Sequence, residues 1–234
     1  MAFIREHVLL LVLIFACVVT FLWLLRFRGR LRMTWWAALG LSLLHVVYGV
    51  ACVSVFARME GASVGAMSIF GAVFFMPIGY FLGAKLFRRS IADVFDIFAI
   101  PMIFTLFCSR INCLMSGCCY GLTIGGSNLR WPTREAEMLF YIVFLALIAP
   151  KVLKGGLSGR VYPLYMAAYG LFRGVIECFR YSATSTGIFH LSHVWAILSF
   201  TLGLTIYLEM GEKRKQQRHN KKRKNKNYMK NWRT

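Results

Sequence analysis

A series of apolar segments, each long enough to cross a lipid bilayer as a helix, runs through most of the chain. A spanning helix needs roughly 20 mostly apolar residues, because that length matches the hydrocarbon core of the bilayer. Seven such segments follow one another, at His7–Leu25, Met33–Ala57, Ala62–Phe87, Ile91–Cys108, Glu135–Val152, Tyr162–Phe179 and His190–Leu208. We therefore predict an all-α integral membrane protein with about seven transmembrane helices.

The composition excludes a soluble globular protein. Hydrophobic residues make up 58% of the 234 residues and charged residues only 16%, which is too few to cover a water-soluble surface. The first apolar segment exceeds the length of a signal-peptide core, and no small-residue cleavage site follows it, so we expect it to remain as a helix.

Basic residues gather between alternate apolar segments. Most of the 28 lysines and arginines lie in residues 26–32, 85–89 and 151–160 and in the C-terminal tail. Because Lys and Arg concentrate in cytoplasmic loops, the N-terminus is predicted outside and the C-terminus in the cytoplasm. We divide the chain into a polytopic membrane domain, 1–210, and a basic cytoplasmic tail, 211–234, which we expect to be disordered and to contact anionic lipids rather than nucleic acid.

The sixth apolar segment contains three charged residues on one helical face. Arg173, Glu177 and Arg180 are spaced i, i+4 and i+7. A charged side chain at the bilayer centre costs about 2.5–3.5 kcal/mol on insertion scales, so such residues mark functional sites more often than structural pairs. Arg173 and Arg180 are suited to a phospholipid phosphate, because a guanidinium offers several donors in a fixed fork.

A second notable stretch, residues 110–121, reads RINCLMSGCCYG and follows the fourth apolar segment on the predicted outer side. We expect Arg110 to join Arg173 around one phosphate. The spacing of Cys113, Cys118 and Cys119 matches no common zinc motif, so we assign no metal and no cofactor. A Cys113–Cys118 disulfide and small apolar filler are the two roles that the residues leave open.

Two further polar residues, Glu137 and His45, can each be interpreted in two ways. Glu137 lies in the first turn of the fifth segment, where it could complement the helix dipole or meet the cationic site. His45 lies inside the second segment, and we interpret it as a satisfied buried side chain rather than a base.

These motifs resemble those of the prolipoprotein diacylglyceryl transferase family. Residues 110–121 are similar to its signature in a Gly-Cys-Cys-Tyr-Gly variant. Residues 131–137, WPTREAE, resemble a degraded form of its His-Pro-Thr/Ser-Gln-Leu-Tyr-Glu segment, and residues 169–180, YGLFRGVIECFR, resemble its late Arg…Glu…Arg helix. The order and spacing of the motifs agree over about residues 60–180, which suggests a divergent member.

The resemblance implies a membrane enzyme of the bacterial cytoplasmic membrane. Such enzymes move the diacylglyceryl group of phosphatidylglycerol onto the lipobox cysteine thiol of preprolipoproteins. By position, the implied catalytic residues are Arg110, Arg173, Glu177 and Glu137. The implied lipid-binding residues are Arg110, Gly121, Arg173, Arg180 and Tyr120.

Four positions depart from the family pattern. Phe70 stands where the family has the histidine of a His-Gly-Gly segment, and Trp131 replaces a second histidine. Cys113 and Cys118 occupy the asparagine and glutamate positions of the better-known signature. The proton acceptor would then be Glu177, Glu137 or Tyr120, unless the chain uses another substrate or is inactive.

Two alternatives from other functional classes stay open at this point. One is a membrane thiol–disulfide redox protein that uses the Cys113, Cys118 and Cys119 cluster. The other is a non-catalytic lipid-binding or transport homologue.

Overall fold

The computed structural model describes residues 2–63, 65–119, 121–125, 129–180 and 191–231. Tyr120, which we predicted to contact lipid, lies outside the described residues.

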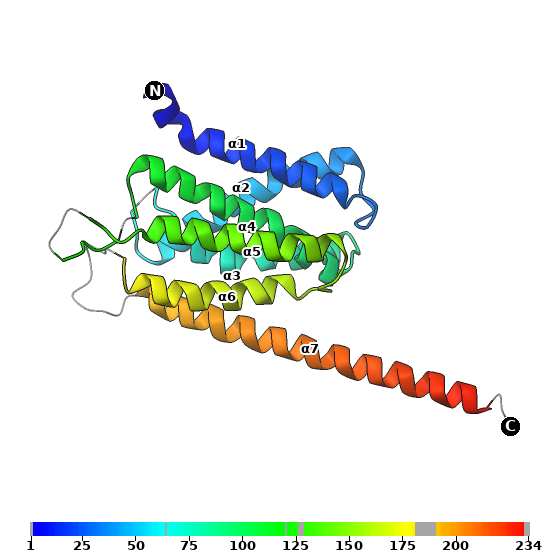
Figure 1. Cartoon of the computed structure of the whole chain (residues 1–234). Coiled ribbons are helices and arrows are strands. Elements are labelled where there is room, and N and C mark those ends of the chain that lie inside the picture. The colour runs from blue at the N-terminus through cyan, green and yellow to red at the C-terminus, as the bar shows by residue number, and fades with distance from the viewer. Residues whose placement is uncertain (1, 64, 120, 126–128, 181–190, 232–234) are drawn as a thin grey trace.

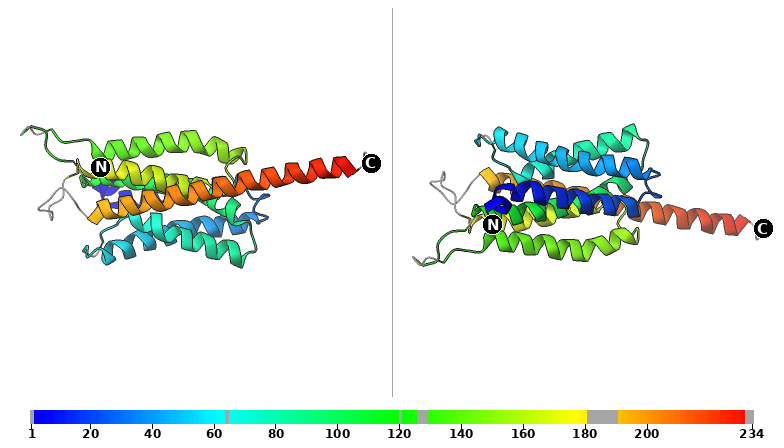
Figure 2. Two further views of the ribbon diagram at one scale, coloured as in Figure 1. Left: turned by 90° about the horizontal axis from the view of Figure 1, so that it is seen from below. Right: turned by 90° about the horizontal axis from the view of Figure 1, so that it is seen from above.

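Seven α-helices run side by side and alternate in direction (Figure 1). Their bounds are α1 Ala2–Arg26, α2 Trp35–Met59, α3 Ile69–Leu86, α4 Ile91–Ser116, α5 Thr133–Leu153, α6 Val161–Glu177 and α7 Leu191–Asn231. The views from below and from above in Figure 2 both show α5 on one flank of the bundle and α2 with α3 on the other. The predicted all-helical membrane architecture is confirmed.

Six of the seven helices are long and apolar enough to cross a membrane by length and composition. The exception is α6, which has 17 residues and ends at Glu177, earlier than the predicted Phe179. It lies against α7 along its whole length (Figure 1). Arg173 and Glu177 are both buried inside the bundle. Their ion pairs offset the cost of placing charge in the bilayer.

The central helix of the bundle is α4, which packs against α1, α2, α3, α5 and α6. It begins after Ser90, whose hydroxyl accepts a hydrogen bond from the Asp93 amide at 3.4 Å. The helix continues to Ser116 and ends at Gly117 in the left-handed conformation, with φ 67°. We predicted that this segment would end at Cys108. The prediction was wrong because glycine first occurs at 117, and residues 109–116 propagate the helix without interruption.

Two other boundaries also differ from the sequence-based expectation. The third helix begins at Ile69 rather than Ala62. The basic tail, which we expected to be disordered, continues α7 as a helix to Asn231. Lys and Arg are good helix formers, so local propensity permits this extension. The division of the chain at residue 210 stays a prediction.

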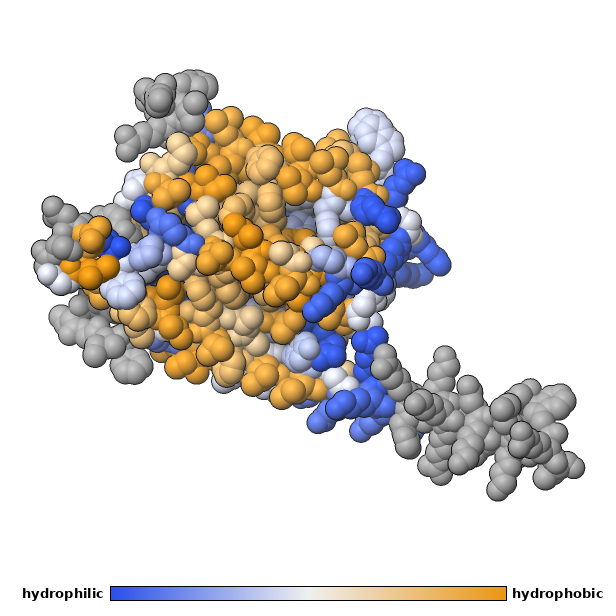
Figure 3. Space-filling model, viewed as in Figure 1, coloured by the Kyte–Doolittle hydropathy of each residue, from blue (hydrophilic) through white to orange (hydrophobic). Residues whose placement is uncertain are grey.

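The two ends of the bundle have different chemistry. Residues 26–32, 85–89 and 151–160 lie at one end, here called the basic end, where α7 leaves the bundle (Figure 1). Figure 3 shows a broad apolar surface and a group of hydrophilic residues at that end. Residues 110–119 and 121–125 lie at the opposite end, here called the signature end. The predicted orientation would place the signature end outside the cell.

Acidic residues hold the connections together at the basic end. Buried Asp96 accepts hydrogen bonds from the backbone amides of Gly159 at 2.6 Å and Val161 at 2.9 Å, which fixes the start of α6 on α4. Asp93 forms an ion pair with Arg30. Asp93 and Asp96 therefore have a structural role, because each binds a loop of this chain.

Glycine allows α6 and α7 to approach closely. A Cβ atom on Gly170 would lie 2.5 Å from the Phe200 amide nitrogen and 2.6 Å from the Ala196 carbonyl oxygen. Close helix contacts of this kind are typical of membrane bundles, where packing rather than hydrophobicity drives association.

We therefore expect Gly170→Ala to lower stability by about 1–3 kcal/mol, because backbone atoms must separate to make room. Gly174→Ala, one turn along on the same helix, is the matched control. Its Cβ would meet only the Ala196 Cβ, at 3.9 Å, which is an ordinary contact. Thermal unfolding of the detergent-solubilised protein measures both variants. Equal melting temperatures for the two variants would contradict this account of the α6–α7 contact.

Candidate functional site

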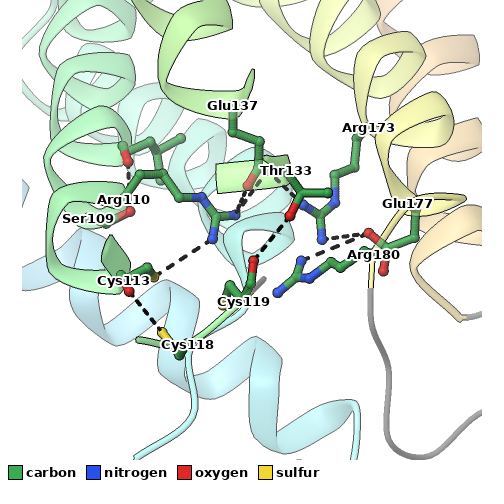
Figure 4. A network of polar contacts seen from close by, with 11 residues as sticks. Ser109, Arg110, Cys113, Cys118, Cys119, Thr133, Glu137, Arg173, Glu177 and Arg180 are labelled. Carbon is green, nitrogen blue, oxygen red and sulfur yellow. Dashed lines mark hydrogen bonds and ion pairs between the residues drawn. The ribbon is translucent and has the colours of Figure 1, made fainter. Parts of the chain in front are cut away.

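A buried network of charged side chains lies at the signature end, between α4, α5 and α6. Its members are Arg110, Glu137, Arg173, Glu177 and Arg180 (Figure 4). The network contains all four predicted catalytic residues. Its fifth member, Arg180, was predicted to bind lipid, as were Arg110 and Arg173. Their proximity is observed, whereas their roles in catalysis stay predictions.

Glu137 is the centre of this network. One carboxylate oxygen is 2.6 Å from Nη1 of Arg173 and 2.9 Å from Nη2 of Arg110, and the other oxygen is 2.8 Å from the same Arg110 nitrogen. The side chains of all three residues are almost completely buried. Glu137 therefore joins the two arginines that the sequence placed together, and the helix-dipole interpretation of this residue is insufficient.

The α6 face continues the network toward the surface. Glu177 lies 2.7 Å from Nη2 of Arg173, one turn earlier on the helix, and 3.9 Å from Nη1 of Arg180. Arg180 is 22% exposed, compared with 6% for Arg173. Arg180 is thus the guanidinium of this network that a phosphate arriving from outside would meet first.

Backbone contacts connect Arg180 to the loop that follows α4. Gly121 and Arg180 form an antiparallel bridge, and the Leu122 amide donates to the Phe179 carbonyl at 2.8 Å. A Cβ atom on Gly121 would collide with the Trp131 carbonyl oxygen and would lie 2.9 Å from the Phe179 carbonyl oxygen. Gly121 is therefore required for close backbone packing beside Arg180. Its predicted contact with lipid stays a prediction.

Three thiols lie next to the arginines. The sulfur atoms of Cys113, Cys118 and Cys119 all lie within 4.8 Å of one another. Nη1 of Arg110 donates to Sγ of Cys113 at 3.8 Å, since both side chains are on the same face of α4. All three cysteines are free thiols, so the Cys113–Cys118 disulfide that the sequence left open is not formed in this structure.

The start of α5 holds the thiol loop in place. The Thr133 hydroxyl donates to the Cys119 carbonyl at 3.2 Å. Nη1 of Arg134 approaches the carbonyl oxygens of Cys113 at 3.5 Å and Cys118 at 3.4 Å. The backbone at all three cysteines is thus fixed by two neighbouring residues.

The loop thiols differ in acidity. A hydrogen bond from Cys113, with the positive charges of Arg180 and Arg110, lowers the pKa of the Cys119 thiol to about 4, although burial opposes this change. Burial raises the pKa of the Cys118 thiol. These contacts favour the thiolate form of Cys119, which is the form of cysteine that acts as a nucleophile or a ligand.

A column of tyrosines beneath the network was not identified from the sequence. Tyr141, Tyr165 and Tyr169 are fully buried, and the Tyr169 ring stacks on both others, with centroids 5.6 Å and 6.0 Å away. The available signal was helical spacing, because Tyr141 is four residues after Glu137 and Tyr169 is four residues before Arg173.

A large cavity lies away from the network. It has a volume of about 660 Å³ and is bounded by α2, α3 and α4 in the half of the bundle nearer the basic end, with Arg32 and Arg89 among its lining residues. His45 lines it and also lines a smaller cavity of about 70 Å³ that reaches Ser109. Within the part of the chain that the structure describes, neither ring nitrogen of His45 has a hydrogen-bond partner, so our interpretation of a satisfied histidine was wrong.

Comparison with known proteins decides the family. The family model described as prolipoprotein diacylglyceryl transferase matches residues 12–209, which includes every element of the network. This chain belongs to the prolipoprotein diacylglyceryl transferase family. It is therefore a multi-pass membrane protein of a transferase family.

A curated relative supports the assignment at lower coverage. A protein of Clostridium tetani (strain Massachusetts / E88), named phosphatidylglycerol–prolipoprotein diacylglyceryl transferase, is 28% identical over 126 residues. The match covers 48% of this chain and 51% of the relative. The chain thus spans about half the length of the curated relative that it matches.

Phe70 and Trp131, which stand where the resemblance led us to expect histidines, differ in burial, since Trp131 is 43% exposed. Phe70 is 3% exposed, and its ring centroid lies 6.1 Å from that of Tyr169. The Trp131 ring lies 4.7 Å from the Phe179 ring. At both positions, where the resemblance led us to expect histidine, the side chain makes aromatic contacts.

The dependence of the network on Glu137 is testable. We expect Glu137→Gln to lower stability by about 3–5 kcal/mol, because Arg110 and Arg173 would be left buried without their shared counter-charge. Glu135→Gln is the control, since Glu135 is 47% exposed and pairs only with Arg134 at 3.4 Å. It should change stability by less than about 0.5 kcal/mol. Thermal unfolding measures both, and a small effect of Glu137→Gln would show that the arginines do not need this carboxylate.

Proposed function

We propose that this protein transfers the diacylglyceryl group of phosphatidylglycerol to the lipobox cysteine thiol of preprolipoproteins at the outer leaflet of the bacterial plasma membrane. Membership of the transferase family supports the reaction class. The observation that carries the proposal is the convergence of Arg110, Arg173 and Arg180 through two glutamates at the signature end.

The arginines are suited to the leaving group of this reaction. When a thiolate attacks the glycerol carbon, the C–O bond breaks and glycerol phosphate departs with an additional negative charge. Guanidinium groups stabilise such charge with short, charge-assisted hydrogen bonds. Arg180 would bind the phosphate first because it is the most exposed of the three, with Arg110 and Arg173 behind it.

Glu137 and Glu177 would position the arginines. Their carboxylates hold the guanidinium planes at fixed places in the absence of substrate. A preorganised site does not have to reorient its dipoles as charge develops, which lowers the barrier to the chemical step.

The surface of α6 offers a path for the lipid. Leu171 and Val175 are 59% and 58% exposed, whereas Arg173, between them in sequence, faces inward. The acyl chains of a phospholipid can therefore remain beside the apolar outer face of α6 while its phosphate reaches Arg180. The acceptor would be the signal peptide of a preprolipoprotein, and the basic tail would contact anionic lipids at the other leaflet.

The test is replacement of the resident transferase in bacterial cells. Cells depleted of their own enzyme should again produce diacylglyceryl-modified lipoprotein, detected by mass, when this chain is expressed. Arg180→Ala should reduce the modification about 100-fold or more, because a donor to the developing charge is lost. Arg58→Ala is the control, since Arg58 is exposed at the end of α2 and outside the network. Unmodified lipoprotein despite normal expression of the wild-type chain would refute the proposed function.

A further inference from the structure

The three loop sulfurs have a geometry that a zinc ion could complete. Tetrahedral zinc binds thiolates at about 2.3 Å, which separates ligand sulfurs by roughly 3.8 Å. The sulfurs of Cys113, Cys118 and Cys119 already lie within 4.8 Å of one another. Small rotations of the side chains would therefore bring all three to bonding distance of one ion, although their spacing along the chain suggested no such site.

Neighbouring residues form hydrogen bonds around the three cysteines, as they do around the ligands of known metal sites. Thr133 and Arg134 hold the carbonyl groups of all three cysteines, so the backbone that carries the ligands is fixed. Arg110 donates to the Cys113 sulfur at 3.8 Å and supplies positive charge beside the thiolates. Outer hydrogen bonds of this kind orient ligands and tune metal affinity.

The cluster also has an open side. Cys118 is exposed, whereas Cys113 and Cys119 are partly buried. Structural zinc sites close all four positions with protein ligands, but catalytic sites use three and leave the fourth for water or substrate. Three cysteines with an exposed edge correspond to the second arrangement.

We propose that Cys113, Cys118 and Cys119 bind a zinc ion whose fourth position takes the thiol of the acceptor cysteine. This inference rests on the proposed function, since it assigns the thiol-activating part of the same site.

The chemistry is balanced without a redox step. The acceptor thiol displaces a zinc-bound water and releases its proton to solvent, because a coordinated thiol is deprotonated. The zinc-bound thiolate sulfur then forms a bond to the glycerol carbon of the lipid. The C–O bond to the phosphate breaks, and its electron pair leaves with glycerol phosphate on the arginines. The thioether product is neutral and binds zinc weakly, so water replaces it.

Activation of the acceptor thiol by zinc would take the place of a protein base at the positions where the family has histidines. Phe70 and Trp131 stand where the family has histidines, so neither position can accept the proton of the acceptor thiol. Glu137 and Glu177 are already engaged by arginines. A zinc ion next to Arg110 would supply a thiolate at neutral pH without a protein base.

The first experiment measures zinc in the full-length protein. The chain is purified under reducing conditions with a tag that lacks histidine, incubated with Zn²⁺, freed of excess metal and analysed by elemental mass spectrometry. We expect about one zinc per chain in the wild type and a loss of at least about tenfold in Cys113→Ser, Cys118→Ser and Cys119→Ser. Cys178→Ser should retain zinc, because Cys178 is exposed at the same end but outside the cluster.

The second experiment tests the fourth position without relying on activity. Co²⁺ replaces zinc, and its absorption spectrum reports thiolate coordination. A synthetic signal peptide with one cysteine should shift the cobalt bands, and the same peptide with serine in that place should not. Absence of zinc from the wild type, zinc retained in the cysteine variants, a Cys113–Cys118 disulfide in place of metal, or identical spectra with both peptides would each overturn the inference.

Failure of this inference and failure of the proposed function are distinguishable. Lipoprotein modification that persists after zinc removal would overturn the metal's role and leave the transferase function intact. Zinc binding with a thiol-dependent cobalt shift, but without modified lipoprotein in cells, would support the metal site and refute the transferase function.

Discussion

The pairing of Glu137 with Arg110 and Arg173 is the interaction on which the rest of the signature end depends. Each of these charges would be costly alone in the membrane, by about 2.5–3.5 kcal/mol on insertion scales. Because α4, α5 and α6 contribute one partner each, the pairs form only when all three helices are in register. The atoms that we propose to bind an anionic ligand thus also constrain how the three helices pack.

The start of α5 extends this constraint to the loop that precedes it. Thr133 and Arg134 bind the loop carbonyls, and Glu137 lies one turn further along the helix. Gly121 joins the same loop to Arg180 by a backbone bridge. The start of one helix therefore holds the cysteine loop and the guanidinium groups in a fixed arrangement.

Much of the fold was predictable because its signals are local. Apolar segments of bilayer length predicted seven helices, and the i, i+4, i+7 spacing predicted the face of Arg173, Glu177 and Arg180. The continuation of α4 to Ser116 was missed because the apolar run ends earlier, although nothing before Gly117 stops a helix. That error concealed the shared face of Arg110 and Cys113.

Contacts between distant segments were harder to predict. The sequence offered Glu137 two roles, and only the packing of α5 against α4 and α6 decides between them. Likewise, the spacing of the cysteines along the chain says little about sulfur positions, because a left-handed Cys119, with φ 60°, folds the loop back on itself. The large cavity lined by His45 depends on helix separation that no local pattern encodes.

The replacement of histidine by Phe70 is informative when the site is considered as a whole. Phe70 is buried and its ring contacts that of Tyr169, so this position contributes an aromatic wall rather than a titratable side chain. In the proposed reaction, the acceptor thiolate would therefore approach from the other side of the arginines, where the cysteine loop lies. The sulfurs of Cys113, Cys118 and Cys119 lie together on that side, and Arg110 contacts both the Cys113 sulfur and Glu137. A thiolate generated there would stand opposite a phosphate bound at Arg180, so that nucleophile and leaving group meet without an intervening proton relay.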